Sequence, residues 1–293
     1  MMGTTSTAPH DTGSGPDEEG DGRGGRFGRI VRSPLGWMLT GMVGVGLVSG
    51  LTATGPGPVP LLGAAAAVAV YWAVMRFVAR RSTPEIARRG AGREVLLGGG
   101  IGLGFIVVSA LLITALGGYA FSWAGNGFVS VVWSAVMVQI GAAVTEELLF
   151  RGLALQALEQ LWGSRAAIAI TGLLFGVAHL GAPGASGWSA VAIALEAGVM
   201  LGAAFLWRRS IWFVAGLHFT WNTAEQLLGI PVSGHTPEGL YTVDVHGSAL
   251  LTGGGFGLET SIVPVVISVL ITVPMVVLAH RSGGLLPRRR ARH

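Results

Sequence analysis

The chain contains no cysteine and no lysine, and charged residues occupy only 12% of its 293 positions. The absence of cysteine excludes disulfide bonds, thiolate catalysis and cysteine-ligated metal sites, so any nucleophile must be a protein oxygen atom or a water molecule. A soluble domain needs more polar cover, whereas 51% of these residues are hydrophobic and the mean hydropathy is +0.62. The composition therefore predicts an integral membrane protein.

Apolar runs of about 20 residues, the length that crosses a bilayer as a helix, recur along the chain. We predict an all-α polytopic membrane protein with about eight transmembrane helices and a polar active site inside the membrane. The fourth span is expected to continue as a more polar helix to about Leu161. The predicted spans are Pro34–Thr54, Pro58–Phe77, Val95–Ala120, Phe128–Leu149, Ala166–Leu180, Trp188–Trp207, Ile211–Leu228 and Thr260–His280.

The predicted membrane domain covers residues 34–280. Residues 1–33 are rich in Gly, Ser, Thr, Asp and Glu and contain no apolar run, which predicts a disordered cytoplasmic tail. Residues 281–293 are expected to form a basic cytoplasmic tail. A secretory signal is not expected, because the first apolar run follows a long acidic segment.

All 19 basic residues are arginines, and all but Arg151 cluster before the first span and near the ends of the second, fourth, sixth and eighth spans. Cytoplasmic loops carry the excess of positive charge, so we predict a multi-pass protein of the plasma membrane with both termini in the cytoplasm. The net charge of +4 then reflects topology and contact with anionic membrane lipid, and nucleic acid is not an expected partner. The one long external segment, 229–259, could cap the domain, and its His235 and His246 are expected to be solvated.

Glycine is frequent, at 48 residues. Pairs at four-residue spacing let membrane helices approach closely. This spacing occurs at Gly46/Gly50, Gly100/Gly104, Gly172/Gly176 and Gly198/Gly202. We therefore predict helix contacts at these four pairs.

Polar side chains inside the spans are expected to be functional, because ionised groups are costly in the bilayer. Glu147 and Arg151 are four residues apart and can pair on one helix face. Glu146 is rotated by about 100° from Glu147 and is left as the available base. Glu225 lies beyond the expected face and Glu196 has no evident partner, so neither is assigned to the site.

The other polar positions repeat the four-residue spacing, with His218 and Asn222 on one span and Phe175 and His179 on another. At about 1.5 Å per residue, Glu146 and His179 lie roughly 22–24 Å from the turn that joins their spans. His218 lies about 13 Å into its own span. It is therefore level with Glu146 and His179 if the turn that joins their spans protrudes by about 10 Å beyond the membrane. We therefore expect one polar pocket that opens toward the cytoplasm.

Three motifs in this order resemble the CPBP family of intramembrane proteases, which includes the type II CAAX prenyl endopeptidases and the bacteriocin-processing or immunity proteins of the Abi family. The paired Glu and Arg motif is Glu146-Glu147-Leu148-Leu149-Phe150-Arg151. The second motif is Phe175-Gly176-Val177-Ala178-His179, and the third is His218-Phe219-Thr220-Trp221-Asn222. Each motif alone is weak, but all three on separate spans make a specific match over about residues 127–228. The resemblance implies that this segment is the catalytic core of the membrane domain.

The resemblance implies an endopeptidase that acts on a membrane-associated peptide or membrane-protein substrate; in eukaryotes the family removes the last three residues after a prenylated cysteine. It implies that Glu146 and His179 activate water while His218 and Asn222 donate to the oxyanion. Glu147 belongs to the implied catalytic set, with Arg151 and Phe175 as structural support.

A metal-dependent route is the alternative, in which Glu146, His179 and His218 bind a divalent metal such as zinc and the bound water attacks. We favour the route without metal, because no His-Glu-x-x-His spacing occurs and Asn222 beside His218 forms a pair of donors.

Two other functions remain open from the sequence. A non-catalytic bacteriocin-immunity or scaffold protein would hold a peptide in the same pocket without cleaving it. A proton-coupled transporter would use the Glu and His side chains as a relay, although the chain shows no internal repeat of the kind on which many transporters are built. The sequence does not identify the substrate.

Overall fold

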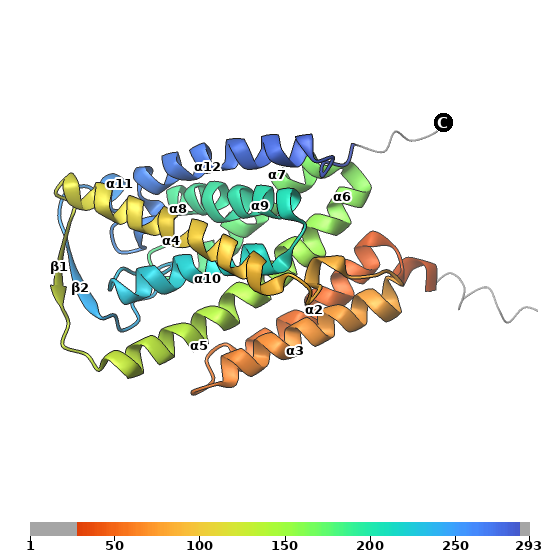
Figure 1. The fold of residues 1–293 in the computed structure, drawn as a ribbon, viewed down its shortest axis with the longest axis horizontal. Coiled ribbons are helices and arrows are strands. Elements are labelled where there is room, and N and C mark those ends of the chain that lie inside the picture. The colour runs from red at the N-terminus through yellow and green to blue at the C-terminus, as the bar shows by residue number, and fades with distance from the viewer. Residues whose placement is uncertain (1–27, 288–293) are drawn as a thin grey trace, which may run out of the picture.

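The computed structural model describes residues 28–287, which form a bundle of long helices (Figure 1). The prediction of an all-α polytopic membrane protein is confirmed. Several helices contain a π-helical segment, in which the backbone ladder is locally wider. The main helical elements are α2 Pro34–Thr52, α3 Val59–Ala73 with η1 Val74–Val78, α4 Ala91–Ala115, α5 Phe128–Glu147 with η3 Leu148–Leu155 and α6 Gln156–Trp162, α7 Ser164–Ala178, α8 Gly187–Ile193 with η5 Ala194–Met200 and α9 Leu201–Arg208, α10 Ile211–Leu227, and α12 Ile262–Arg281.

Within the described residues, seven helices are long and apolar enough to cross a membrane, one fewer than the eight predicted. The difference is α10, which has 17 residues and falls short of the usual spanning length of about 20. Twelve of its residues are buried, so α10 is an internal helix of the bundle. This is the helix that carries His218 and Asn222.

Serine residues fix the starts of several helices, because a serine hydroxyl can accept a hydrogen bond from a free N–H group of the first turn. Ser33 begins α2 in this way, Ser210 begins α10 and Ser261 begins α12. Between α6 and α7, Gly163 has φ +81°, a conformation that favours glycine. These signals separate helices that the apolar pattern alone would merge.

Glycines bring α4 and α10 into direct backbone contact. A Cβ atom at Gly98 or Gly102 of α4 would overlap a carbonyl oxygen of α10, and a Cβ atom at Gly216 would lie 2.5 Å from the carbonyl oxygen of Val95. Of the predicted pairs, Gly172/Gly176 and Gly198/Gly202 do pack against neighbouring helices. The pairs Gly46/Gly50 and Gly100/Gly104 face open space, so their predicted role in packing is wrong.

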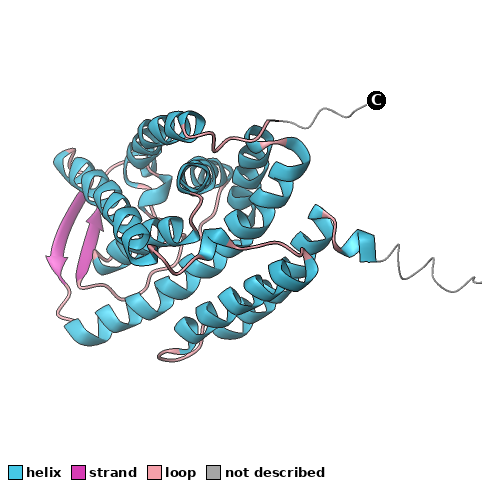
Figure 2. Ribbon diagram, turned by 45° about the vertical axis from the view of Figure 1, so that its right-hand side comes forward, coloured by secondary structure: helices cyan, strands magenta, loops and turns pink. Residues whose placement is uncertain are grey.

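A small antiparallel sheet closes one end of the bundle (Figure 2). It pairs β1 Tyr119–Trp123 with β2 Tyr241–Val245, and Tyr119 lies opposite Val245. Both strands were predicted as parts of connections or helix ends, and the predicted span that ended at Ala120 ends at Ala115. The remaining short elements are η2 Pro84–Ile86, η4 His179–Gly181, α11 Ala249–Thr252 and η6 Leu258–Thr260.

The two predicted tails lie partly outside the described residues, which exclude 1–27 and 288–293. Where the structure describes them, they are ordered: residues 28–31 are helical. At the other terminus, the backbone of Leu286 accepts a hydrogen bond from the Ser164 amide over 3.0 Å and donates to the Ser164 hydroxyl over 2.7 Å. The domain boundaries at 33 and 281 stay predictions of the sequence.

The bundle has two chemically different ends. One end carries β1 and β2, and the opposite end carries the turns after η1, α6, α9 and α12 (Figure 1). The arginine clusters predicted from the sequence fall at this second end, whereas residues 117–127 and 229–259 at the sheet end contain no arginine. The alternation of ends that the charge pattern predicted is present in the fold.

Candidate active site

The two adjacent glutamates lie at the end of α5, where the helix widens into the π-helical segment η3. Such segments are frequent at functional sites because they redirect side chains within a helix. Glu147 is fully buried, whereas Glu146 is half-buried. Glu147 therefore lies in the protein interior, whereas its neighbour Glu146 lies on the wall of a cavity.

The carboxylate of Glu147 contacts two side chains, those of Arg151 and His218. Arg151 Nη1 donates to Glu147 Oε1 over 2.9 Å, and His218 Nδ1 contacts the same oxygen over 2.9 Å. Arg151 also donates through Nη2 to the carbonyls of Ala197 and Gly198 in η5, the latter at 3.2 Å. The predicted Glu147–Arg151 pair is present, and it further ties α5 to α10 and to η5.

His179 lies at the end of α7, one turn after Phe175. Its Nδ1 lies 2.8 Å from the Phe175 carbonyl oxygen, and the imidazole stacks on the Phe175 ring at 4.8 Å. Because a carbonyl oxygen only accepts, Nδ1 carries the hydrogen and Nε2 remains free. The Arg151 guanidinium lies over the Phe175 ring at 4.9 Å, which explains why an aromatic residue is useful here.

His218 and Asn222 come from α10, one helical turn apart. Since the Glu147 carboxylate accepts the hydrogen bond from His218 Nδ1, the Nε2 atom of this imidazole is also left unpaired. Asn222 is 8% exposed, and among residues 28–287 its side chain has no hydrogen-bond partner. Both side chains are therefore available to a ligand.

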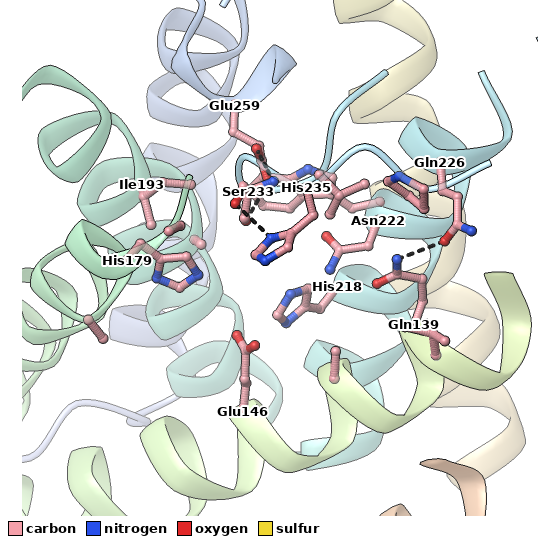
Figure 3. A pocket seen from close by; sticks show the side chains of 18 of the residues that line it. Gln139, Glu146, His179, Ile193, His218, Asn222, Gln226, Ser233, His235 and Glu259 are labelled. Carbon is pink, nitrogen blue, oxygen red and sulfur yellow. Dashed lines mark hydrogen bonds between the residues drawn. The ribbon is translucent and has the colours of Figure 1, made fainter. Parts of the chain in front are cut away.

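Glu146, His179, His218 and Asn222 line one cavity of about 660 Å³ (Figure 3). Glu146 faces the imidazoles across this space and has no hydrogen bond to the described part of the chain. The structure thus brings the predicted catalytic side chains together from three helices. Further polar lining that the sequence did not predict comes from Gln139, Gln226, Ser233, His235 and Glu259.

The position of the cavity does not fit arginine-rich cytoplasmic turns and a cytoplasmic opening of the pocket at the same time. Its exposed lining residues, Ala178, Gly181 and His235 among them, belong to the end of α7 and to the 229–259 segment at the sheet end. The arginine-rich turns lie at the other end (Figure 1). The predicted depths of Glu146, His179 and His218 agree with a shared cavity, but the depth argument could not decide from which end it opens.

The two loop histidines, both expected to be solvated, have different environments. His235 lines the cavity, whereas His246 is exposed just beyond β2. His235 was missed because nothing in the spacing of a loop shows where the loop folds back. The turn signal Ser233-Gly234 beside it was the only hint in the sequence.

Glu259, also missed, lies on the cavity wall in η6, outside the membrane spans, and is 2% exposed. Burial raises the pKa of its carboxyl to about 7, while hydrogen bonds from Ser233 act in the opposite direction. Glu196 and Glu225 are fully buried and, among the described residues, have no hydrogen-bond partners. Neither of these two lines the cavity.

The residues do not form a metal centre as placed. In the part of the chain that the structure describes, no three His, Asp or Glu side chains are arranged to hold a metal ion. Glu146, His179 and His218 share a cavity, but they do not form such a group. A divalent metal held by Glu146, His179 and His218 stays a prediction of the sequence.

Comparison with known proteins identifies the segment that carries this site. Residues 128–224 match the family model described as type II CAAX prenyl endopeptidase Rce1-like, about a third of the chain. No curated protein and no solved structure matches the chain. The matched segment begins with α5 and includes most of α10, so it contains all the predicted catalytic residues. The resemblance to this family is thus confirmed over residues 128–224, which are similar to the Rce1-like type II CAAX prenyl endopeptidases.

Proposed function

We propose that this chain is an intramembrane endopeptidase that hydrolyses a peptide bond in a membrane-associated substrate, such as a prenylated peptide. One observation carries the proposal: Glu146, His179, His218 and Asn222 come from three helices of the matched domain and line one cavity. A peptidase needs a base for water and donors for the oxyanion within reach of one peptide bond. This cavity supplies both kinds of group.

Glu146 is the base in this proposal. It lines the cavity and, among the described residues, forms no ion pair that would fix its carboxylate, so it can take a proton from water. His179, with Nδ1 committed to the Phe175 carbonyl, offers Nε2 to the same water. The water oxygen then attacks the carbonyl carbon of the peptide bond.

His218 and Asn222 stabilise the negative charge that develops on the carbonyl oxygen. Glu147 accepts the hydrogen bond from His218 Nδ1, and its negative charge favours the protonated imidazole, which donates from Nε2. The Asn222 amide adds a neutral donor one helical turn away. Donors fixed before the reaction are effective because they need no reorganisation when the charge forms.

A metal ion is not assigned to this reaction, because the described His, Asp and Glu residues form no ligand group. Water activation by Glu146 and His179 needs only side chains that are present. Measurement of zinc and other divalent metals in the purified active protein, together with the effect of a chelator, distinguishes the two routes.

The proposed location is the plasma membrane, with the arginine-rich end and both termini in the cytoplasm. Since the cavity lies toward the opposite end, this orientation gives it access from the outer side. Substrates would then be peptides or membrane proteins that reach the outer half of the membrane.

The proposal is tested with purified protein and a synthetic peptide that carries S-farnesyl cysteine four residues from its C-terminus. Released fragments are identified by mass. Cleavage by the wild type and its loss in Glu146→Ala and His179→Ala, with the proteins still folded, supports the proposal. Full activity in either variant contradicts it, and no cleavage by the wild type favours a non-catalytic role or a different substrate class.

A further inference from the structure

His235 occupies the cavity wall across from Glu146. It lies outside the matched segment 128–224, and its imidazole points into the space between His179 and His218 (Figure 3). His235 is exposed, and it lines the cavity. A third imidazole therefore reaches the site from the segment that closes the sheet end.

A tight turn presents this histidine. The amide of Val232 donates to the carbonyl of His235 over 2.8 Å, and the amide of His235 donates back over 2.9 Å. The two central residues have positive φ, +47° at Ser233 and +80° at Gly234. This is the pattern of a type I′ turn, in which glycine is favoured at the second central position.

The turn is anchored to the rest of the molecule at several points. Ser233 donates to the buried Glu259 carboxylate from its amide over 2.9 Å and from its hydroxyl over 2.9 Å. The Gly234 amide donates to the Phe256 carbonyl over 2.6 Å, and a Cβ atom at Gly234 would overlap the Pro183 carbonyl. These contacts fix the position from which the imidazole of His235 extends.

The imidazole ring of His235 is oriented by a hydrogen bond from Nδ1, as are the rings of His179 and His218. His235 Nδ1 lies 3.1 Å from the Ser233 carbonyl oxygen, so Nδ1 carries a hydrogen and Nε2 is left for the cavity. In His179 and His218 the Nδ1 atom is likewise committed to a protein oxygen. Such a tether sets which ring nitrogen can exchange a proton with a ligand.

Peptide hydrolysis also needs an acid for the leaving nitrogen, a role that the proposed mechanism has not yet assigned. The nitrogen of the scissile bond must receive a proton as it leaves, because a free amide anion is too basic to depart. Glu146 takes a proton from water, and His218 and Asn222 donate to the oxyanion. His235 is the imidazole of the cavity that has no role in those steps.

We propose that His235 is the general acid that protonates the leaving amine. Glu146 removes a proton from water as its oxygen bonds to the carbonyl carbon. The carbon–nitrogen bond then breaks, its electron pair stays on nitrogen, and that nitrogen takes the proton from Nε2 of the His235 imidazolium. The proton held by Glu146 passes to solvent and His235 regains one from solvent, so the net reaction consumes one water.

This inference rests on the proposed function, and the experiment separates the two. The substrate is the S-farnesyl peptide, compared with an analogue in which an ester replaces the scissile amide. An ester releases an alkoxide, which departs with much less help from an acid. His235→Gln keeps a donor for the Ser233 carbonyl but cannot act as an imidazole acid.

We expect His235→Gln to lower kcat for the amide by about 10²-fold, as is typical for loss of a general acid, with kcat for the ester changed by less than about threefold. Equal losses on both substrates would show a structural role, and unchanged amide hydrolysis would show that another group is the acid; both overturn the proposal. Failure of the wild type to cleave the amide overturns the proposed function as well.

The matched control is His246→Gln, which removes the other histidine of the 229–259 segment, an exposed residue outside the cavity. It should retain wild-type rates on both substrates. Glu146→Gln should lose activity on both, because both reactions need an attacking water. If Glu146→Gln is inactive and His235→Gln is not, only the role of His235 is wrong.

Discussion

At the scale of residues, the two neighbouring glutamates show how different environments give identical side chains different roles. Glu147 is fully buried and pairs with Arg151 and His218 through one oxygen atom. Glu146 is half-buried on the cavity wall and keeps its carboxylate free. The division follows from the rotation of about 100° between successive residues of a helix, which turns one inward and the other toward the cavity.

Replacing Glu147 should therefore affect folding as well as activity. Glu147→Ala leaves the Arg151 guanidinium buried beside carbonyl groups alone, and removal of one partner of a buried pair costs about 3–5 kcal/mol. Glu146→Ala breaks no ion pair and should change stability far less. Thermal unfolding of the two variants in the same detergent tests the contrast, and equal stability would contradict it.

Glu259 gives the stability a dependence on pH. Burial raises its pKa from 4.5 to about 7, so between these values the folded protein holds a proton that the unfolded chain releases. The contribution of Glu259 to stability is therefore fully present below about pH 4.5. It is lost as pH rises to about 7, a change on the order of 3 kcal/mol.

Glu259→Gln should remove the part of the loss of stability with rising pH that comes from Glu259. Melting temperatures of the variant and the wild type, measured from pH 5 to pH 8, should differ in slope. The exposed residue Glu238 offers the control substitution, Glu238→Gln, whose curve should run parallel to that of the wild type. A parallel curve for Glu259→Gln would disprove the assignment.

At the scale of elements, the position of α10 depends on glycines in α4. Gly102 lies where any Cβ atom would overlap the carbonyl oxygen of Leu217 and approach the Thr220 hydroxyl to 2.6 Å. Leu217 directly precedes His218. The α4–α10 contact therefore sets the depth at which the proposed oxyanion donors stand.

Gly102→Val should separate the two helices, lower the stability by about 1–3 kcal/mol and reduce activity through His218. Gly104→Val is the matched control, because a Cβ atom there meets open space. The yield of folded protein by size-exclusion chromatography and the cleavage rate are compared for the two variants. Equal behaviour would show that close approach at Gly102 is not required.

The apolar runs predicted the long helices to within a few residues, but they did not predict the departures from regular helix. The composition of the π-helical segments η3 and η5 does not distinguish them from an α-helix, since both are mostly apolar, with Arg151 in η3 and Glu196 in η5. The strands had a faint signal: Tyr241-Thr242-Val243-Asp244-Val245 contains β-branched and aromatic residues. Five residues in a long connection were too few to outweigh the expectation of a loop.

At the scale of the whole molecule, charge and cavity lie at opposite ends. The arginine-rich turns lie at one end, and the cavity lies toward the end closed by β1 and β2 (Figure 1). Two predictions from the sequence, cytoplasmic arginines and a cytoplasmic opening of the pocket, therefore cannot both hold. Sequence spacing gave the depth of Glu146 and His218 but not the side from which substrate enters.

The orientation can be measured directly, because the chain has no cysteine. Thr236→Cys places a single thiol at the exposed sheet end, and Ser282→Cys places one at the exposed arginine-rich end. In intact cells, a membrane-impermeant maleimide should label the first and should reach the second only after permeabilisation. The reverse pattern would place the cavity on the cytoplasmic side.

The candidate site was predicted in its helical members and missed in its loop members. Glu146, His179, His218 and Asn222 are at positions where helical spacing carries three-dimensional information. His235 and Glu259 reach the cavity through the fold of the 31-residue connection 229–259. The sequence of this connection has no periodicity that would predict where it folds back. The structure therefore adds the wall that covers the site, and with it the proposed acid.

The central claim is that Glu146 activates the attacking water, and the rate of peptide hydrolysis by Glu146→Gln tests it most directly. The purified variant, the wild type and the exposed-carboxylate control Glu238→Gln are compared on the S-farnesyl peptide. The account predicts a loss of at least about 10²-fold for Glu146→Gln, with normal folding and wild-type rates for the control. A rate for folded Glu146→Gln within a few-fold of the wild type would contradict it.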